Sequence, residues 1–105
     1  MSVQTPRMTQ LEAMLADEPN DAELRYFLAM EHISAGDEAA GLEMLRKLTA
    51  TANYVPAFLQ AGQLLNRLDH VSEACAVLRK GIEAARIQWN DHALGEMQGL
   101  LDSIE

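Results

Sequence analysis

The sequence predicts an all-α protein, a short right-handed superhelix of stacked helix-turn-helix repeats with about six helices. Ala, Leu, Met and Glu dominate the 105 residues and aromatic residues make up only 5%, a composition that favours helices. Apolar residues recur at helical spacing, and no alternating strand pattern occurs. One segment is also repeated, and self-similarity at a fixed period is typical of a helical repeat array.

The repeated segment spans residues 53–85 and reads as two helices joined by a polar turn. Because each helix pair has an apolar face that it cannot bury alone, neighbouring pairs are expected to stack. Shifted back by 33 residues, the landmarks fall on an earlier copy: Ala61-Gly62 onto Leu28-Ala29, Ala74 onto Gly41, Leu78 onto Leu45 and Arg79-Lys80 onto Arg46-Lys47.

The first element is a half-repeat helix over residues 6–18. Thr5 is a favourable N-cap, and Pro6 suits the first helical position because its missing N–H has no partner there. Pro19 disfavours α geometry in the residue before it, so the helix ends near Asp17. The predicted apolar stripe comprises Met8, Leu11, Met14 and Leu15.

Residues 21–52 form the first complete repeat. Asn20 or Asp21 caps its first helix, and Asn20 with Glu23 has the spacing of a capping box. Gly36 supplies the left-handed residue that ends this helix, and Asp37 caps the next. The Thr-Ala-Thr-Ala-Asn run ends the second helix, with Asn53 expected to adopt positive φ. The inner faces carry Leu24, Phe27, Leu28 and Ile33, then Leu42, Met44, Leu45 and Leu48.

Residues 55–88 form the second repeat, and residues 91–104 form a capping helix that completes a single domain over residues 1–105. Pro56 opens the first helix of this repeat. Gly62 lies inside that helix, where it costs about 1 kcal/mol relative to alanine, so we expect a tight helix contact there. Asp69-His70 make the turn, and Asn90-Asp91 break the chain before the last helix.

Charge and composition exclude several classes of protein. Sixteen acidic residues against eight basic ones give a formal charge of −8, and the basic residues are dispersed, so nucleic-acid binding is disfavoured. Cys75 is the only cysteine, so no internal disulfide is possible. The N-terminus lacks a signal-like apolar region, and no apolar run approaches the roughly 18 residues of a membrane span. We therefore expect a soluble cytoplasmic protein.

Both copies carry a recognisable pattern of landmarks. The later copy reads Phe58-x2-Ala61-Gly62-x2-Leu65 and then Ala74-x3-Leu78, whereas the earlier copy reads Arg25-x2-Leu28-Ala29-x2-His32 and then Gly41-x3-Leu45. The pattern resembles the tetratricopeptide repeat, a unit of about 34 residues, over roughly residues 7–100. The earlier copy departs from the family where Arg25 replaces a large aromatic residue and Ala52 replaces the closing proline.

The resemblance implies a non-catalytic protein-binding or peptide-binding adaptor or scaffold, because the first helices of tetratricopeptide pairs line a concave groove that holds a peptide. The apolar first half and amide-rich second half suit a short apolar segment whose backbone is held by Gln63 and Asn66. The implied groove residues are Glu23, Tyr26, Phe27, Met30 and Ile33, then Leu59, Gln60, Gln63, Asn66 and Arg67, with His92 and Glu96 closing the far end.

Other interpretations compete with this one. Phe27, Met30 and Ile33 are also explained as packing against a neighbouring helix. A receptor for a partner's C-terminal carboxylate is disfavoured, because the matching positions offer one base at most, Arg67. An alternative from another functional class is a self-associating structural subunit, which would pair two chains through exposed apolar residues. Those residues are Trp89, Leu100 and Ile104. The chain is therefore expected to be a monomer or a weak homodimer.

No catalytic or metal constellation can be assembled. His32, His70 and His92 lie on three different elements and lack metal-ligand spacing, and each is interpreted as an exposed or helix-end histidine. Cys75 reads as a small buried apolar residue rather than a reactive thiol. We therefore expect no enzymatic activity, no cofactor and no metal, and the expected partner is another protein or peptide.

Overall fold

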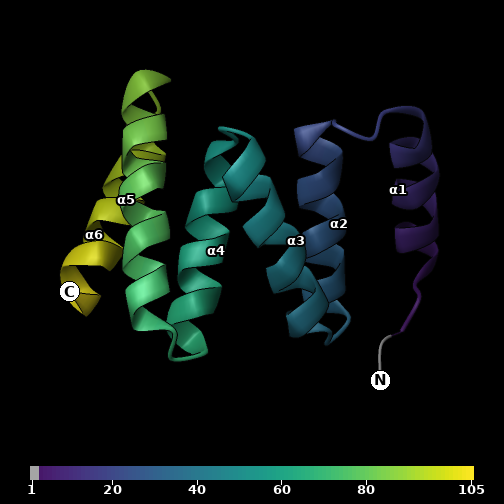
Figure 1. Ribbon diagram of the computed structural model, residues 1–105, viewed down its shortest axis with the longest axis horizontal. Coiled ribbons are helices and arrows are strands. Elements are labelled where there is room, and N and C mark those ends of the chain that lie inside the picture. The colour runs from purple at the N-terminus through teal and green to yellow at the C-terminus, as the bar shows by residue number, and fades with distance from the viewer. Residues whose placement is uncertain (1–2) are drawn as a thin grey trace. The chain divides into compact units, whose positions relative to one another are not determined.

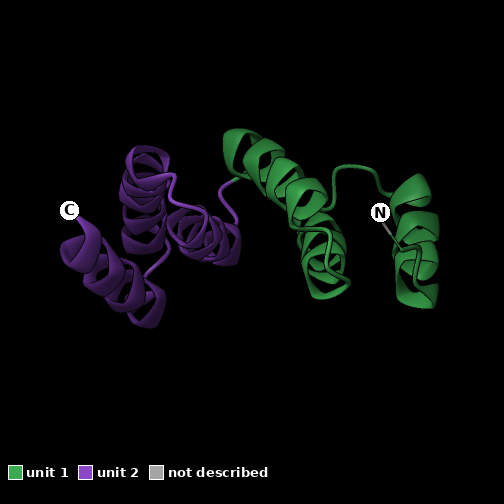
Figure 2. Ribbon diagram, turned by 90° about the horizontal axis from the view of Figure 1, so that it is seen from below, with its two compact units in different colours: residues 1–52 green, residues 53–105 purple. Residues whose placement is uncertain are grey.

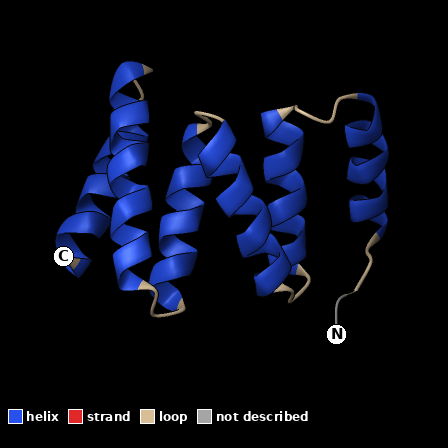
Figure 3. Ribbon diagram, in the orientation of Figure 1, coloured by secondary structure: helices blue, strands red, loops and turns tan. Residues whose placement is uncertain are grey.

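The computed structural model describes residues 3–105, which contain six helices and no strand (Figures 1 and 3). Short loops join consecutive helices. The all-α prediction is therefore confirmed. The helices are α1 (Pro6–Asp17), α2 (Ala22–Ser34), α3 (Glu38–Thr51), α4 (Val55–Arg67), α5 (Val71–Ile87) and α6 (Asp91–Ile104).

The helices fall into two compact units, coloured separately in Figure 2. Unit 1 covers residues 1–52 and includes α1, α2 and α3, and unit 2 covers residues 53–105 and includes α4, α5 and α6. In unit 1, α2 packs against both α1 and α3. In unit 2, each of the three helices contacts the other two. Each unit thus consists of a helix pair with one further helix against it.

Most of the helices begin after a residue whose side chain accepts a hydrogen bond from an N–H group of the first turn. The Thr5 hydroxyl accepts a hydrogen bond from the Met8 N–H at 3.1 Å, as predicted. Asp37 caps α3 by accepting from the Ala40 N–H at 3.1 Å, also as predicted. The capping box of Asn20 and Glu23 is wrong: α2 begins at Ala22, so Asp21 is the N-cap. A cap of this kind stabilises a helix by about 1 kcal/mol.

The end of α3 differs from the prediction. Asn53 does not adopt positive φ; among the described non-glycine residues only Asp69 and Trp89 do. The helix instead runs through Thr51, and Ala52 leaves it with extended backbone at φ −144°. The Thr49 hydroxyl donates to the Leu45 carbonyl and the Thr51 hydroxyl to the Lys47 carbonyl, so both threonines are satisfied within the helix.

The core of unit 1 joins α1 to α2 through Met8, Leu11 and Leu28, which are all buried. A polar contact adds to it, because the Thr5 hydroxyl donates to Glu31 Oε1 at 3.0 Å. Met14, predicted on the same apolar stripe, is 52% exposed instead. The stripe on α1 is therefore narrower than its sequence suggests.

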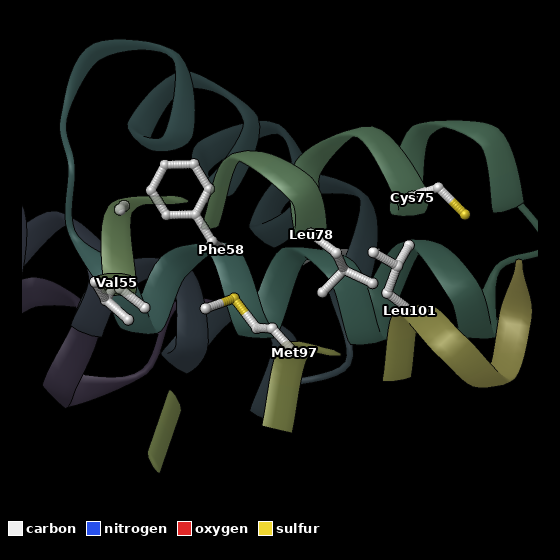
Figure 4. Packing of buried hydrophobic residues seen from close by; sticks show 8 residues of the cluster. Val55, Phe58, Cys75, Leu78, Met97 and Leu101 are labelled. Carbon is white, nitrogen blue, oxygen red and sulfur yellow. The ribbon is translucent and has the colours of Figure 1, made fainter. Parts of the chain in front are cut away.

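The core of unit 2 gathers side chains from all three of its helices. Figure 4 shows the Met97 side chain reaching from α6 toward Phe58 and Val55 of α4, while Leu101 lies beside Leu78 of α5. The eight buried members of this core are Val55, Phe58, Cys75, Leu78, Ala84, Ala85, Met97 and Leu101.

Gly62 makes the tight contact that its position inside α4 required. A Cβ atom at this residue would lie 2.4 Å from Leu78 Cδ2 and 2.7 Å from Leu78 Cγ. Real Cβ atoms do not approach other carbons so closely, so the missing side chain allows α5 to pack directly on α4. The prediction of close packing at Gly62 is confirmed.

Candidate interaction surface

One face of α2 carries Glu23, Tyr26 and Met30, residues that recur at helical spacing. Glu23 is exposed, and Tyr26 and Met30 are half-buried. The Tyr26 ring lies 6.0 Å from the Phe27 ring, tilted by 53°, an arrangement favoured by aromatic pairs. Neighbouring aromatic packing therefore orients Tyr26, while its partial exposure leaves it within reach of a ligand.

Phe27 and Ile33, predicted on the same surface, contact neighbouring helices. Phe27 is half-buried against the core cluster of unit 1, and the Arg7 guanidinium carbon lies 5.9 Å from the centre of its ring. Ile33 packs on α3, since a Cβ on Gly41 would lie 2.4 Å from Ile33 Cγ1. Both side chains stabilise unit 1, and of the five residues predicted on α2 only Glu23 is exposed.

The predicted face of α4 in unit 2 is polar. Gln63 and Arg67 are exposed, and Gln60 and Asn66 are half-buried. Leu59, the one apolar member, packs against the core of unit 2. The face therefore offers amide donors and acceptors beside a guanidinium, groups that pair with a peptide backbone and with carboxylates.

His92 and Glu96 lie one turn apart on α6 and form an ion pair when the imidazole is protonated. The His92 side chain is 87% exposed, so this part of α6 faces solvent. Such an exposed pair contributes little to stability.

The structure brings together no metal-binding cluster within residues 3–105. No group of three or more His, Cys, Asp and Glu side chains in that range is arranged to hold a metal ion. Cys75 is a free, buried thiol within the core of unit 2. No helix in the described part of the chain is long and apolar enough to cross a membrane.

His32 lies in the last turn of α2 and is a helix-end histidine, as predicted. Both of its ring nitrogens, however, are buried and have no hydrogen-bond partner. With the repeat period of 33 residues, the equivalent position in the second repeat is Leu65, which is 1% exposed. Unit 1 therefore holds a polar ring where unit 2 holds an apolar side chain, and buried polar atoms without partners destabilise the folded state.

We expect His32→Leu to raise the free energy of unfolding by about 1 kcal/mol, because leucine removes the unpartnered nitrogens and matches the residue of the other repeat. Denaturant unfolding followed by circular dichroism measures the change. Leu65→His is the matched control and should be destabilising. A loss of stability in His32→Leu would mean that the imidazole has a partner in solution.

A small hollow in unit 1 was missed by sequence reasoning. It has a volume of about 120 Å³. Arg25 on its wall donates from Nη2 to the Thr51 hydroxyl at 3.2 Å. Arg25 occupies the position that Phe58 has in the later repeat. This replacement of an aromatic ring by a flexible cation was the sequence signal for the hollow. The lining residues are Leu15, Arg25, Leu28, Met44 and Lys47.

Comparisons with known proteins agree with this architecture. A family model described as tetratricopeptide repeat matches residues 1–55. A crystal structure of a tetratricopeptide repeat domain protein from Salinibacter ruber is 30% identical, covers 80% of this chain and 94% of that chain, and has a TM-score of 0.75.

A solution NMR structure of a tetratricopeptide repeat domain protein from the same organism is 32% identical, covers 83% of this chain and 89% of that chain, and has a TM-score of 0.78. No match was found among curated proteins. The tetratricopeptide fold generally serves as a scaffold for protein–protein interaction. By sequence and by structure, this chain belongs to the tetratricopeptide repeat family.

Proposed function

We propose that the chain is a non-catalytic adaptor that binds a short apolar segment of another protein through the first helix of each pair. The supporting observation is the partial exposure of Tyr26 and Met30 on α2, the helix whose Phe27 packs against the core of unit 1. Methionine adapts its shape to different apolar partners, and tyrosine combines an apolar ring with a hydrogen-bonding hydroxyl. These properties suit recognition of an apolar peptide.

The α4 face supplies the polar part of the proposed recognition. Gln63 and Asn66 each carry an amide that can both donate to a carbonyl and accept from an N–H of an extended peptide. A ligand with accessible backbone groups therefore fits the chemistry of this α4 face.

Met30→Glu is expected to weaken binding of the peptide ligand by about tenfold or more, because it places a charge on the apolar contact surface. Ligands are obtained by selecting a displayed library of random short peptides against the wild-type chain, and affinity is measured by fluorescence anisotropy. Met14→Glu is the matched control: Met14 is also accessible in unit 1 but lies on α1, outside the proposed surface.

The circular dichroism spectrum of both variants should match that of the wild type. If Met14→Glu and Met30→Glu weakened binding equally, the effect would arise from charge alone and the α2 surface would be rejected. If Met30→Glu lost helicity, Met30 would belong to the core of unit 1. Tyr26→Ala, measured with the same ligand, then tests the surface without adding a charge.

The competing prediction of a self-associating subunit relied on Trp89, Leu100 and Ile104. Leu100 and Ile104 are half-buried and pack against the core of unit 2, because α6 lies against both α4 and α5. Only Trp89 among them is strongly exposed. An apolar dimer interface on the terminal helix itself thus lacks two of its three predicted residues, which favours the adaptor.

A further inference from the structure

Two basic side chains of unit 1 have no acidic partner, although the chain holds sixteen acidic residues and only eight basic ones. Within residues 3–105, neither Arg25 nor Lys47 forms an ion pair, and the Lys47 ammonium donates no hydrogen bond. Other basic side chains do pair with carboxylates: Arg7, Arg46, Arg79 and Arg86. Arg25 and Lys47 are therefore two cations whose charge this acidic chain leaves uncompensated.

Both cations line the small hollow of unit 1. The other lining residues are apolar: Leu28 is buried, and Leu15 and Met44 are half-buried. The hollow thus takes side chains from α1, α2 and α3. Its volume of about 120 Å³ is close to the roughly 150 Å³ of an apolar cavity that binds benzene, so it admits one aliphatic side chain.

A hydrogen bond holds Arg25 against the helix that carries Lys47. Arg25 Nη2 donates to the Thr51 hydroxyl at 3.2 Å, and that hydroxyl donates to the Lys47 carbonyl at 2.8 Å. The bond to Thr51 uses one of the five N–H donors of the guanidinium, so others remain for a carboxylate. Because the side chain is already positioned, less conformational entropy is lost when a ligand binds.

The hollow lies away from the α2 surface proposed above for the apolar peptide. An α-helix turns by about 100° per residue. Arg25 and Leu28 therefore share one side of α2, whereas Tyr26 and Met30 share the nearly opposite side. A ligand in the hollow contacts α1 and α3 in addition to α2, and it does not compete directly for Tyr26 or Met30.

We propose that this hollow is a second docking site, which takes one aliphatic side chain of a partner protein together with a neighbouring Glu or Asp carboxylate. The aliphatic side chain fills the space between Leu15, Leu28 and Met44, and the carboxylate pairs with Arg25 and Lys47. A wholly apolar ligand would remove water from the two cations without replacing its hydrogen bonds. A wholly acidic ligand would leave the apolar walls in water. Only a ligand with both groups matches the site.

The formal charge of −8 does not prevent this contact. At physiological ionic strength the Debye length is about 8 Å, so acidic residues farther away are largely screened, whereas a carboxylate touching Arg25 is not. Exposed ion pairs are weak, and the hollow holds a single side chain, so we expect a dissociation constant of about a millimolar for a short peptide.

Amide chemical shifts of the isotope-labelled full chain, titrated with a short peptide, test the proposal. The probe is Ser-Glu-Leu-Glu-Ser with both ends blocked, so that its only charges are the two Glu carboxylates. We expect saturable changes at Leu15 of α1 and at Met44 and Lys47 of α3. Replacing both Glu residues of the peptide by Gln, or its Leu by Ala, should each weaken binding by about fivefold or more.

Lys47→Glu is expected to weaken binding of the same peptide by about fivefold or more, because it reverses one of the two charges. Lys47 is exposed, so the circular dichroism spectrum should not change. Lys80→Glu is the matched control: Lys80 has the equivalent position in the later repeat and also lines a hollow, but Glu83 lines that hollow too. This control should leave the titration unchanged.

Unaltered affinity of the Gln peptide or of Lys47→Glu would overturn the proposal, as would a titration without changes in α1 and α3. Changes at these same amides on concentrating the unliganded protein, or on adding vesicles of anionic lipid, would show a second copy or a membrane surface as the occupant and would also overturn it. Met30→Glu should keep the affinity for this probe, and Lys47→Glu should keep that for the apolar peptide, so the two sites succeed or fail separately.

Discussion

Phe58→Ala is expected to lower the free energy of unfolding of unit 2 by about 3–5 kcal/mol. Phe58 is 1% exposed and is the largest of the fully buried side chains. It lies against Gly81 of α5 and belongs to the same buried cluster as Met97 of α6, so its loss leaves a cavity where all three helices of the unit meet. The surrounding atoms cannot fill that cavity without moving a helix, which places the cost well above that of the lost apolar contact alone.

Amide hydrogen exchange on the full chain measures this effect separately in each unit. Exchange in α4, α5 and α6 should accelerate together, because Phe58 touches the other two helices. Arg25→Ala is the matched control: it truncates the equivalent position of the earlier repeat, where the side chain is half-buried, and should cost less than about 1 kcal/mol. Equal costs at the two positions would contradict the assignment of Phe58 as the centre of this core.

Gly81→Ala is expected to destabilise unit 2 by about 1–3 kcal/mol, although alanine is the better helix former by about 1 kcal/mol. A Cβ at Gly81 would lie 2.4 Å from Phe58 Cβ and 2.5 Å from the Met97 sulfur. The sulfur can move with its flexible side chain. Phe58 Cβ is attached directly to the α4 backbone, so relief there requires α4 and α5 to separate.

Gly95→Ala and Gly99→Ala are the matched controls for this substitution. Both glycines lie inside α6, and a Cβ at either position would meet no atom within 4 Å. Each alanine should therefore stabilise the chain by up to about 1 kcal/mol through helix propensity alone. Thermal unfolding compares the three variants, and a Gly81→Ala protein as stable as the wild type would show that α5 does not pack closely on α4.

The helices could be predicted because the residues that start and end them lie next to them in the sequence. Thr5 and Pro6 start α1, Asp37 caps α3 and Gly36 ends α2, and each acts through bonds to residues within one turn. The error at Asn20 and Asp21 arose because either residue can cap and only the geometry of the loop selects one. The error at Asn53 arose because α3 ends with Ala52 in extended backbone and not with a left-handed residue.

The candidate surface was harder to predict, because helical spacing does not distinguish an inward apolar residue from an accessible one. Phe27 and Met30 are both apolar and lie on the same helix, yet Phe27 packs against the core of unit 1. The Arg7 side chain lying over the Phe27 ring comes from α1, and such a contact has no signal in the sequence of α2. The groove as a whole stays a prediction.

The backbone conformation of Trp89 could not be predicted from the sequence either. Trp89 was expected to be exposed, which the structure confirms. Its positive φ, however, is set by the return bond from the Asn90 N–H to the Ala85 carbonyl, and residues in this conformation are usually glycine or asparagine. A rule based on residue preference would place a glycine there, so the strain becomes visible only in the backbone itself.

The most direct test of the proposed adaptor is a map of amide chemical-shift changes when the isotope-labelled full chain binds a selected peptide. The proposal predicts that the changes concentrate along residues 23–33 of α2 and residues 59–67 of α4. Changes confined to α1, α3 or the end of α5, with these two segments unaffected, would contradict it.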